Sequence, residues 1–167
     1  MFCCRSAFEG CENLQSVILP EGLKEISDYA FCGCSSIKSI TLPQGVNSIE
    51  SGVFSGCNSL TNVVILAEKV TWRDGSTFKG CSSLTSITLP EGITGIPAYS
   101  FDGCSSLQEI IVPESVTYIG KYAFSNCTSL QSIMLSDNVN SIGEYAFSGC
   151  SSLKSMQLPK KLTKINT

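Results

Sequence analysis

The sequence predicts an α/β solenoid, a chain that winds through stacked copies of one 23-residue unit. Two residue types mark this unit in a single register. A phenylalanine returns at steps of 23, 23, 24, 23, 23 and 23 residues, and a cysteine follows each one three positions later. A fixed period of roughly 20 to 50 residues is typical of stacked repeats, in which each unit buries its apolar side against its neighbours. The markers are Phe8, Phe31, Phe54, Phe78, Phe101, Phe124 and Phe147, with Cys11, Cys34, Cys57, Cys81, Cys104, Cys127 and Cys150.

The first element of each unit is predicted to be a short strand. Its pattern is L-x-x-(I/V)-x-L, seen first at Leu14, Val17 and Leu19. Such a run with β-branched residues near its centre suits a strand that pairs in parallel with its copies above and below. A proline ends the pattern in five units, and where a glycine follows in Pro-Glu-Gly or Pro-Gln-Gly it supplies a tight turn. The prolines are Pro20, Pro43, Pro90, Pro113 and Pro159.

The second half of the unit carries two apolar residues three positions apart, such as Leu23 and Ile26. This spacing does not by itself separate a second strand from a turn of helix. We favour a short strand. A helical or 3₁₀ turn over Tyr-Ala-Phe-x-x-Cys would then place the alanine, the phenylalanine and the cysteine in the core.

One unit departs from the pattern between Ile65 and Phe78, where it has an extra residue and no proline. It can be a tolerated insertion that bulges on the convex edge and keeps Val70 and Trp72 in register, because loop length costs little to vary. It can also be a contact site, because tryptophan and arginine are enriched among interface hot spots. We favour the insertion and keep Trp72 and Arg73 as candidate contact residues.

The chain has ten cysteines, and seven of them occupy one repeat position. Neighbours in a column of coils about 4.8 Å apart could form disulfides, or small buried thiols could fill the same space. We favour thiols, because free cysteine is among the most buried residue types. Cys3 falls at a core isoleucine position, whereas Cys4 and Cys32 fall at variable polar positions.

The composition excludes several classes of function. With 11 basic and 14 acidic residues there is no cationic surplus to neutralise phosphates, so nucleic acid is not an expected partner. No apolar run approaches the roughly 18 to 20 residues of a membrane span, so we expect no membrane insertion by this segment. The absence of histidine excludes serine-histidine triads and cysteine-histidine pairs. We therefore expect no enzyme and no cofactor.

A column of acidic residues at the turns could be imagined as a calcium-binding rim. Gln44 and Lys160 interrupt this column, so we expect a solvated edge and no metal site. The acidic members are Glu21, Glu91, Glu114 and Asp137.

Residues 34–56, 81–103 and 104–126 carry the unit C-S-S-L-x-S-I-x-L-P-x-G-V-x-x-I-x-x-Y-A-F-x-G. This unit resembles the BspA-like, or type-5, leucine-rich repeat, and the resemblance covers essentially the whole chain. It implies a right-handed curved solenoid with a parallel sheet on its concave side. It also implies a cell-surface or secreted protein that adheres to host matrix proteins or to other microbes. We expect residues 1–167 to form a single leucine-rich-repeat solenoid of about seven repeats, taken from a longer array.

The candidate partner-binding face lies on the strands, at positions between the core residues. Glu109 belongs to one outward column, which is otherwise mostly serine. A second column reads Ile18, Thr41, Val64, Thr88, Ile111, Met134 and Gln157, and its first six members are candidate contact residues. Its apolar members have no core role if the L-x-x-I-x-L residues point inward, although β-branched residues are also simply good strand formers. A shallow strip of this kind suits a protein or a glycan better than a small molecule.

We therefore predict a non-catalytic protein-binding or adhesion module that uses the concave strand face. The alternative is a structural spacer, or stalk, in a larger surface protein. Uncapped coils at either end would also allow end-to-end self-association.

Overall fold

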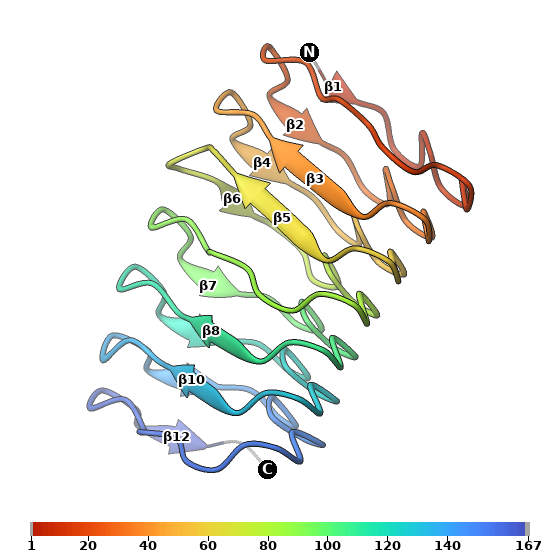
Figure 1. Ribbon diagram of the computed structural model, residues 1–167. Coiled ribbons are helices and arrows are strands. Elements are labelled where there is room, and N and C mark those ends of the chain that lie inside the picture. Colours follow the sequence, from red (N-terminus) through yellow and green to blue (C-terminus); the bar gives the residue numbers. More distant parts are fainter. Residues whose placement is uncertain (1, 166–167) are drawn as a thin grey trace.

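The computed structural model describes residues 2–165 and arranges them as a solenoid of short parallel strands (Figure 1). One row of strands carries the L-x-x-I-x-L segments and consists of β3 (Ser39–Leu42), β5 (Asn62–Ile65), β8 (Glu109–Ile111) and β10 (Ser132–Met134). The second row lies behind it in Figure 1 and carries the paired apolar residues. Its strands are β1 (Phe2–Cys3), β2 (Glu25–Ile26), β4 (Ser48–Ile49), β6 (Thr71–Trp72), β7 (Gly95–Ile96), β9 (Tyr118–Ile119), β11 (Ser141–Ile142) and β12 (Lys164–Ile165). The short second strand that we favoured is confirmed.

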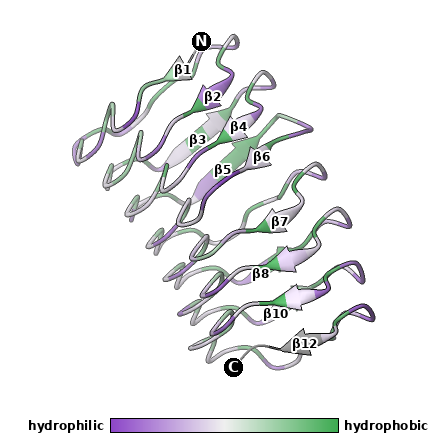
Figure 2. Ribbon diagram, turned by 180° about the vertical axis from the view of Figure 1, so that it is seen from behind, coloured by the Kyte–Doolittle hydropathy of each residue, from purple (hydrophilic) through white to green (hydrophobic). Residues whose placement is uncertain are grey.

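Strand pairing follows the repeat. Ser39 in β3 lies opposite Asn62 in β5, and Glu25 in β2 lies opposite Ser48 in β4, so each pair is one unit apart. Along β3 the side chains alternate, with Ile40 and Leu42 buried. This confirms that the L-x-x-I-x-L residues point inward. Figure 2 shows hydrophilic residues gathered at the turns that join the two rows of strands.

The phenylalanines form one continuous column inside the solenoid. Consecutive rings from Phe8 to Phe147 lie with their centroids 5.2 to 5.8 Å apart and their planes within 14° of parallel. The five inner rings are completely buried. The 24-residue step does not interrupt the column, because Phe54 and Phe78 are 5.5 Å apart. Stacked rings of this kind contribute beyond the apolar area that they bury.

The α half of the predicted α/β class is not confirmed, because residues 2–165 contain no helix. The segment around each phenylalanine is a series of tight turns, in which the Cys34 amide donates to the Phe31 carbonyl at 3.2 Å. Tyr29 and Gly33 have φ values of 55° and 72°. A right-handed helix cannot pass through such residues, so the chain is broken on both sides of the phenylalanine. The Phe31 amide instead donates to Val53 in the next coil at 3.0 Å.

The cysteine column consists of free thiols, as we favoured. The Cys57 thiol donates to the carbonyl oxygen of Phe31 in the preceding coil at 3.2 Å, and that oxygen also accepts the Cys34 amide. A thiol is small and apolar and still has one weak donor, so it fills the core and links two coils. The same thiol-to-carbonyl bond recurs at Cys34, Cys81, Cys104, Cys127 and Cys150.

Cysteines outside the buried column also lie where the repeat register places them. Cys3 pairs with Ile26 across β1 and β2 and packs against the core, as predicted. Cys4 is exposed and Cys32 is half-buried. Cys11, which belongs to the first coil of the column, is exposed because no coil precedes it in the described residues.

Candidate functional site

The predicted outward column is exposed and forms one strip across the first row of strands. Ile18 is 96% exposed, Ile111 67%, Met134 66% and Val64 37%. Thr41 and Thr88 are exposed as well. We call these six residues the outward strip.

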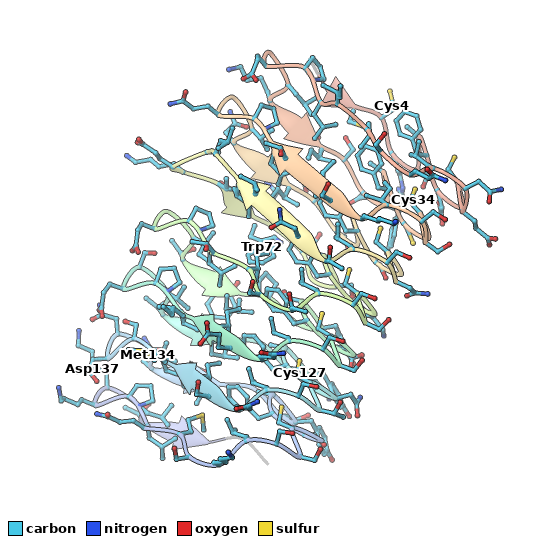
Figure 3. All side chains as sticks on the ribbon, in the orientation of Figure 1. Cys4, Cys34, Trp72, Cys127, Met134 and Asp137 are labelled. Carbon is cyan, nitrogen blue, oxygen red and sulfur yellow. The ribbon has the colours of Figure 1, made fainter. Side chains whose placement is uncertain are left out.

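Members of the outward strip lie side by side on neighbouring strands. Thr41 pairs with Val64, and Ile111 pairs with Met134. Figure 3 shows Met134 on the first row of strands, away from the buried Trp72. Ile111 and Met134 are therefore adjacent apolar residues on the surface, and the exposure inferred from the repeat pattern is correct.

Glu109 is also exposed on this row, where it pairs with Ser132 in β10. It lines a shallow cavity of about 390 Å³ between residues 86–89 and β8, which we call the strand-face hollow. The outward side chains of the hollow are Ser86, Thr88, Glu91, Glu109 and Ile111.

A second hollow, of about 240 Å³, adjoins Met134 on the next coils. It is lined by Glu114, Asp137 and Leu158 among others, and Leu158 is 45% exposed. The outward strip is therefore bordered by two hollows with carboxylates on their walls.

Trp72 does not belong to the candidate face, because its side chain is buried. It lies opposite Ile49 in the strand register and meets the rings of Phe78 and Phe101 edge-on, at centroid distances of 5.8 and 5.7 Å. Its indole Nε1 donates to the Thr77 hydroxyl. Trp72 is a core residue, and its inclusion among the contact residues was wrong.

Arg73 is exposed, and its Nε lies 3.4 Å from the Glu50 carboxylate. It begins the segment that holds the extra residue, since three residues separate Trp72 from Ser76 where other units have two. Ser76 has a φ of 65° and occupies the position of Tyr29 in the repeat. The extra residue therefore follows β6, and Arg73 comes directly after a strand of the second row, whereas the outward strip lies on the first row.

The parallel ladders are interrupted between this unit and the next. Within residues 2–165 the second-row strands form one sheet that ends at β6 and another that ends at β7. In other units the residue after the strand donates its amide to the preceding coil, as Gly120 does to Ile96 at 2.7 Å. The equivalent residue after β7 is Pro97, which has no amide hydrogen.

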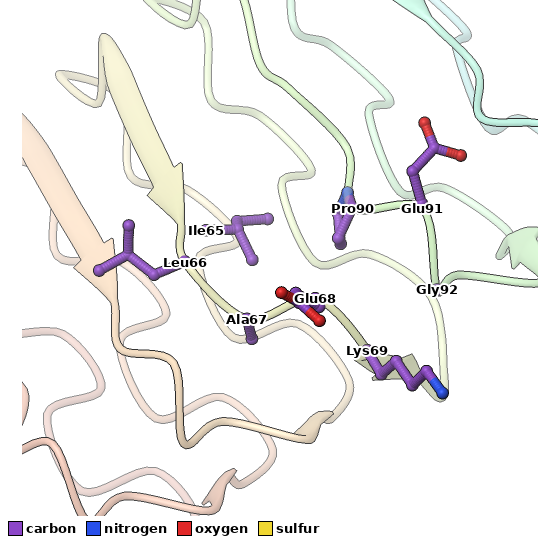
Figure 4. A pocket seen from close by; sticks show the side chains of 8 residues that line it. All are labelled: Ile65, Leu66, Ala67, Glu68, Lys69, Pro90, Glu91 and Gly92. Carbon is purple, nitrogen blue, oxygen red and sulfur yellow. The ribbon is translucent and has the colours of Figure 1, made fainter.

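A third cavity lies at this interruption, on the side of the turns (Figure 4). It measures about 500 Å³ and we call it the junction pocket. Leu66 takes the place of the missing proline there and is 51% exposed. Glu91 lines both the junction pocket and the strand-face hollow. The missing proline and the presence of Pro97 are the sequence features from which the junction pocket and the interrupted ladder could have been predicted.

Two members of the acidic turn column, Glu114 and Asp137, accept hydrogen bonds from side chains of the next coil. Glu114 accepts from Asn138 and Ser136 at 3.1 and 3.0 Å, and Asp137 accepts from Lys160. The bond from Lys160 lowers the pKa of Asp137 below its ordinary value. Within the described part of the chain, no three Cys, Asp or Glu side chains are grouped as metal ligands would be. Nor does any helix in residues 2–165 have the length and apolarity to cross a membrane.

Comparisons with known proteins agree with this repeat over nearly the whole chain. The profile of the BspA type leucine-rich repeat region matches in six copies, over residues 4–75 and 73–167. A leucine-rich repeat protein from Bacteroides ovatus superposes with a TM-score of 0.87 at 30% identity, over 96% of this chain and 42% of that chain. One from Eubacterium ventriosum gives 0.84 at 28% identity, over 97% and 43%. The chain therefore spans less than half the length of these two proteins.

A leucine-rich repeat protein of T. pallidum is also similar, with a TM-score of 0.57 at 32% identity, over 86% of this chain and 58% of that chain. No curated protein matches the sequence.

Proposed function

Because the chain belongs to the BspA-type leucine-rich repeat family, we propose that it is a non-catalytic module that binds a protein or a glycan through the outward strip. It acts at the cell surface or after secretion, as the family resemblance implies. Adhesion to a host matrix protein or to another cell surface is the role that fits such a module best.

The observation that carries this proposal is the exposure of Ile111 and Met134 on neighbouring strands. Their column accepts threonine at Thr41 and Thr88, so a solvent-facing strand here has no structural need of apolar side chains. Covering an exposed side chain of this size can contribute about 1.5 to 3 kcal/mol. A partner that covers both Ile111 and Met134 would therefore obtain part of its binding free energy from these two side chains.

The state of the thiols supports a non-catalytic role. Burial raises the pKa of Cys57 to about 12, and that of Cys34 to about 11. The thiolate is the nucleophilic form of cysteine, so these side chains are unreactive near neutral pH. Cys34 and Cys57 therefore serve packing.

The test compares the chain with an I111T/M134T variant on an immobilised panel of host extracellular-matrix proteins and glycans. Threonine is the residue that this column already holds at two positions, so folding should be kept. We expect the double variant to bind at least about tenfold more weakly, since it loses two apolar contacts. A Y118T variant is the matched control, because Tyr118 is 40% exposed on the opposite row of strands.

Equal binding by the parent and I111T/M134T would remove the outward strip as the site. A parent chain that binds nothing on the panel would favour the structural spacer.

A further inference from the structure

The carboxylates around the outward strip indicate the chemistry of its partner. Glu91 and Glu109 are exposed and line the strand-face hollow on either side of Ile111. The described ion pairs are Arg5–Asp28, Arg73–Glu50, Lys79–Asp102, Lys121–Glu144 and Lys160–Asp137. Neither Glu91 nor Glu109 takes part in them, so both charges are available to a partner.

Further negative charge continues along the same border. Glu114 and Asp137 line the hollow beside Met134. Asp137 is paired with Lys160, and Glu114 accepts hydrogen bonds from the neutral side chains of Ser136 and Asn138. Lys161 donates to Asn138, so both lysines lie beside this part of the border, whereas Lys38 and Lys154 lie on coils toward the two ends. The part of the outward strip at Ile111 is therefore apolar, with an acidic border formed by Glu91 and Glu109.

Lys69 is the basic residue closest to Glu91 in the described cavities. It lines the junction pocket together with Glu68 and Glu91, and it takes part in none of the described ion pairs. Glu91 stands between this pocket and the strand-face hollow. A cationic group from a partner can thus reach Glu91 while apolar groups beside it contact Leu66 on one side and Ile111 on the other.

We propose that the outward strip binds a cationic, partly apolar peptide segment of another protein. This inference rests on the proposed function and specifies its partner. Apolar side chains of the segment cover Ile111 and Met134, and lysine or arginine side chains pair with Glu91 and Glu109. Charges arranged in this way speed the encounter and select against acidic partners more than they add affinity.

The proposed ion pairs also predict that the affinity for the peptide depends on the salt concentration. Exposed charges are screened over about 8 Å at physiological ionic strength, so the electrostatic part of the binding weakens as salt is added. The apolar part does not weaken. Binding should therefore fall with salt to a plateau that Ile111 and Met134 set.

The probe is a labelled peptide of alternating lysine and leucine, followed by fluorescence anisotropy. About six residues suffice, since an extended chain of that length spans about 20 Å and so crosses four coils spaced by about 4.8 Å. A lysine and serine peptide tests the cationic charge without leucine, and a glutamate and leucine peptide keeps the leucines and reverses the sign of the charge. We expect the lysine and leucine peptide to bind most tightly and the glutamate and leucine peptide least.

Two charge variants decide the role of the carboxylates. E91Q/E109Q should weaken the lysine and leucine peptide about fivefold to tenfold, as the loss of two exposed ion pairs predicts. E9Q/E12Q removes the same net charge from exposed positions near the phenylalanine turns and should change the affinity less than about twofold. I111T/M134T should weaken the same peptide and lower the plateau at high salt.

The proposal is overturned if the glutamate and leucine peptide binds as tightly, if the parent binds none of the peptides, or if E91Q/E109Q binds like E9Q/E12Q. The proposed function fails separately. It fails when I111T/M134T retains full binding to the matrix and glycan panel. If I111T/M134T loses binding to the panel and E91Q/E109Q keeps it, the outward strip is the binding face but its partner is not cationic.

Discussion

The Cys57 sulfur lies 3.2 Å from the carbonyl oxygen of Phe31, in the coil before its own. This contact joins the two markers of the repeat, because six of the seven stacked phenylalanines, from Phe8 to Phe124, also accept a thiol bond from the cysteine of the following coil. At this edge of the solenoid, stacked rings and hydrogen bonds between coils therefore occur together.

Replacing a thiol in the middle of the column should destabilise the fold. Cys81 is completely buried and donates to Phe54 at 3.1 Å. C81A removes this bond and leaves a small cavity, so we expect the free energy of unfolding to fall by about 1 to 3 kcal/mol in urea titrations. C4A, at an exposed cysteine, should change it by less than about 0.5 kcal/mol. Equal stabilities would show that the column is not a source of stability.

Stability should fall in alkaline solution because of the buried thiols. Burial raises the pKa of Cys57 from 9.0 to about 12, so the folded chain holds this proton more tightly than the unfolded chain. The contribution is complete below about pH 9 and is lost as the pH rises toward 12. Urea titrations between pH 8 and pH 11 should show the decline, and C57A should make it shallower. An unchanged slope in C57A would assign the decline to other groups.

Trp72 should be needed for folding and dispensable for binding. It fills the core between Phe78 and Phe101, so W72A should lower the free energy of unfolding by about 3 to 5 kcal/mol. W72I restores the residue type of Ile49 and Ile96 in the same column and should cost less. If W72A were as stable as the parent chain and no longer bound its partner, Trp72 would instead be a contact residue.

Gly75 should tolerate no side chain. A Cβ atom at this position would lie 1.8 Å from the carbonyl oxygen of Ala98 in the next coil. G75A should therefore destabilise the chain by about 1 to 3 kcal/mol. Gly22 is the matched control, because a Cβ atom there meets nothing within 4 Å. A thermal melt in which G75A and G22A coincide would contradict the close packing after β6.

The interrupted ladder should be visible in amide hydrogen exchange. The Thr117 amide donates to the Thr94 carbonyl at 2.9 Å, whereas the Thr94 amide faces the interruption. We expect Thr94 to exchange faster than Thr117, since an unbonded amide needs no local opening. The same comparison holds for Thr85 against Gln108, whose amide donates to the Thr85 carbonyl at 3.1 Å. Equal protection within both pairs would mean that the ladders are continuous.

Most of the fold could be predicted because the same contacts recur in every unit, so the residues that make them recur in the sequence. The recurrence of Phe31 and Cys34 predicted the stacked rings and the buried thiols, and alternation around Ile40 predicted which residues face outward. The missing helix could not be predicted in the same way. A positive φ at Tyr29 is uncommon for a residue with a bulky side chain, and only Gly33 carried a sequence signal for it.

The irregular unit was predicted less well because its packing is specific to one place. Trp72 has no counterpart in other units. It contacts Phe101, which belongs to the next coil, and the pattern within one unit does not predict contacts between coils. The effect of Pro97 on strand pairing follows from its missing amide, but only once the register of β6 and β7 is known. The pattern located the outward strip, whereas Glu91 required the structure to place it beside Ile111.

The most direct measurement is the oxidation of Met134 in the presence of whichever matrix protein, glycan or peptide retains the parent chain. Met134 is 66% exposed, and hydrogen peroxide converts such a side chain to the sulfoxide, which mass spectrometry quantifies. Met156, which packs against the core, is the internal control. The account predicts that a bound partner slows the oxidation of Met134 several-fold and leaves that of Met156 unchanged. Oxidation of Met134 at the same rate in the bound and free chains would contradict it.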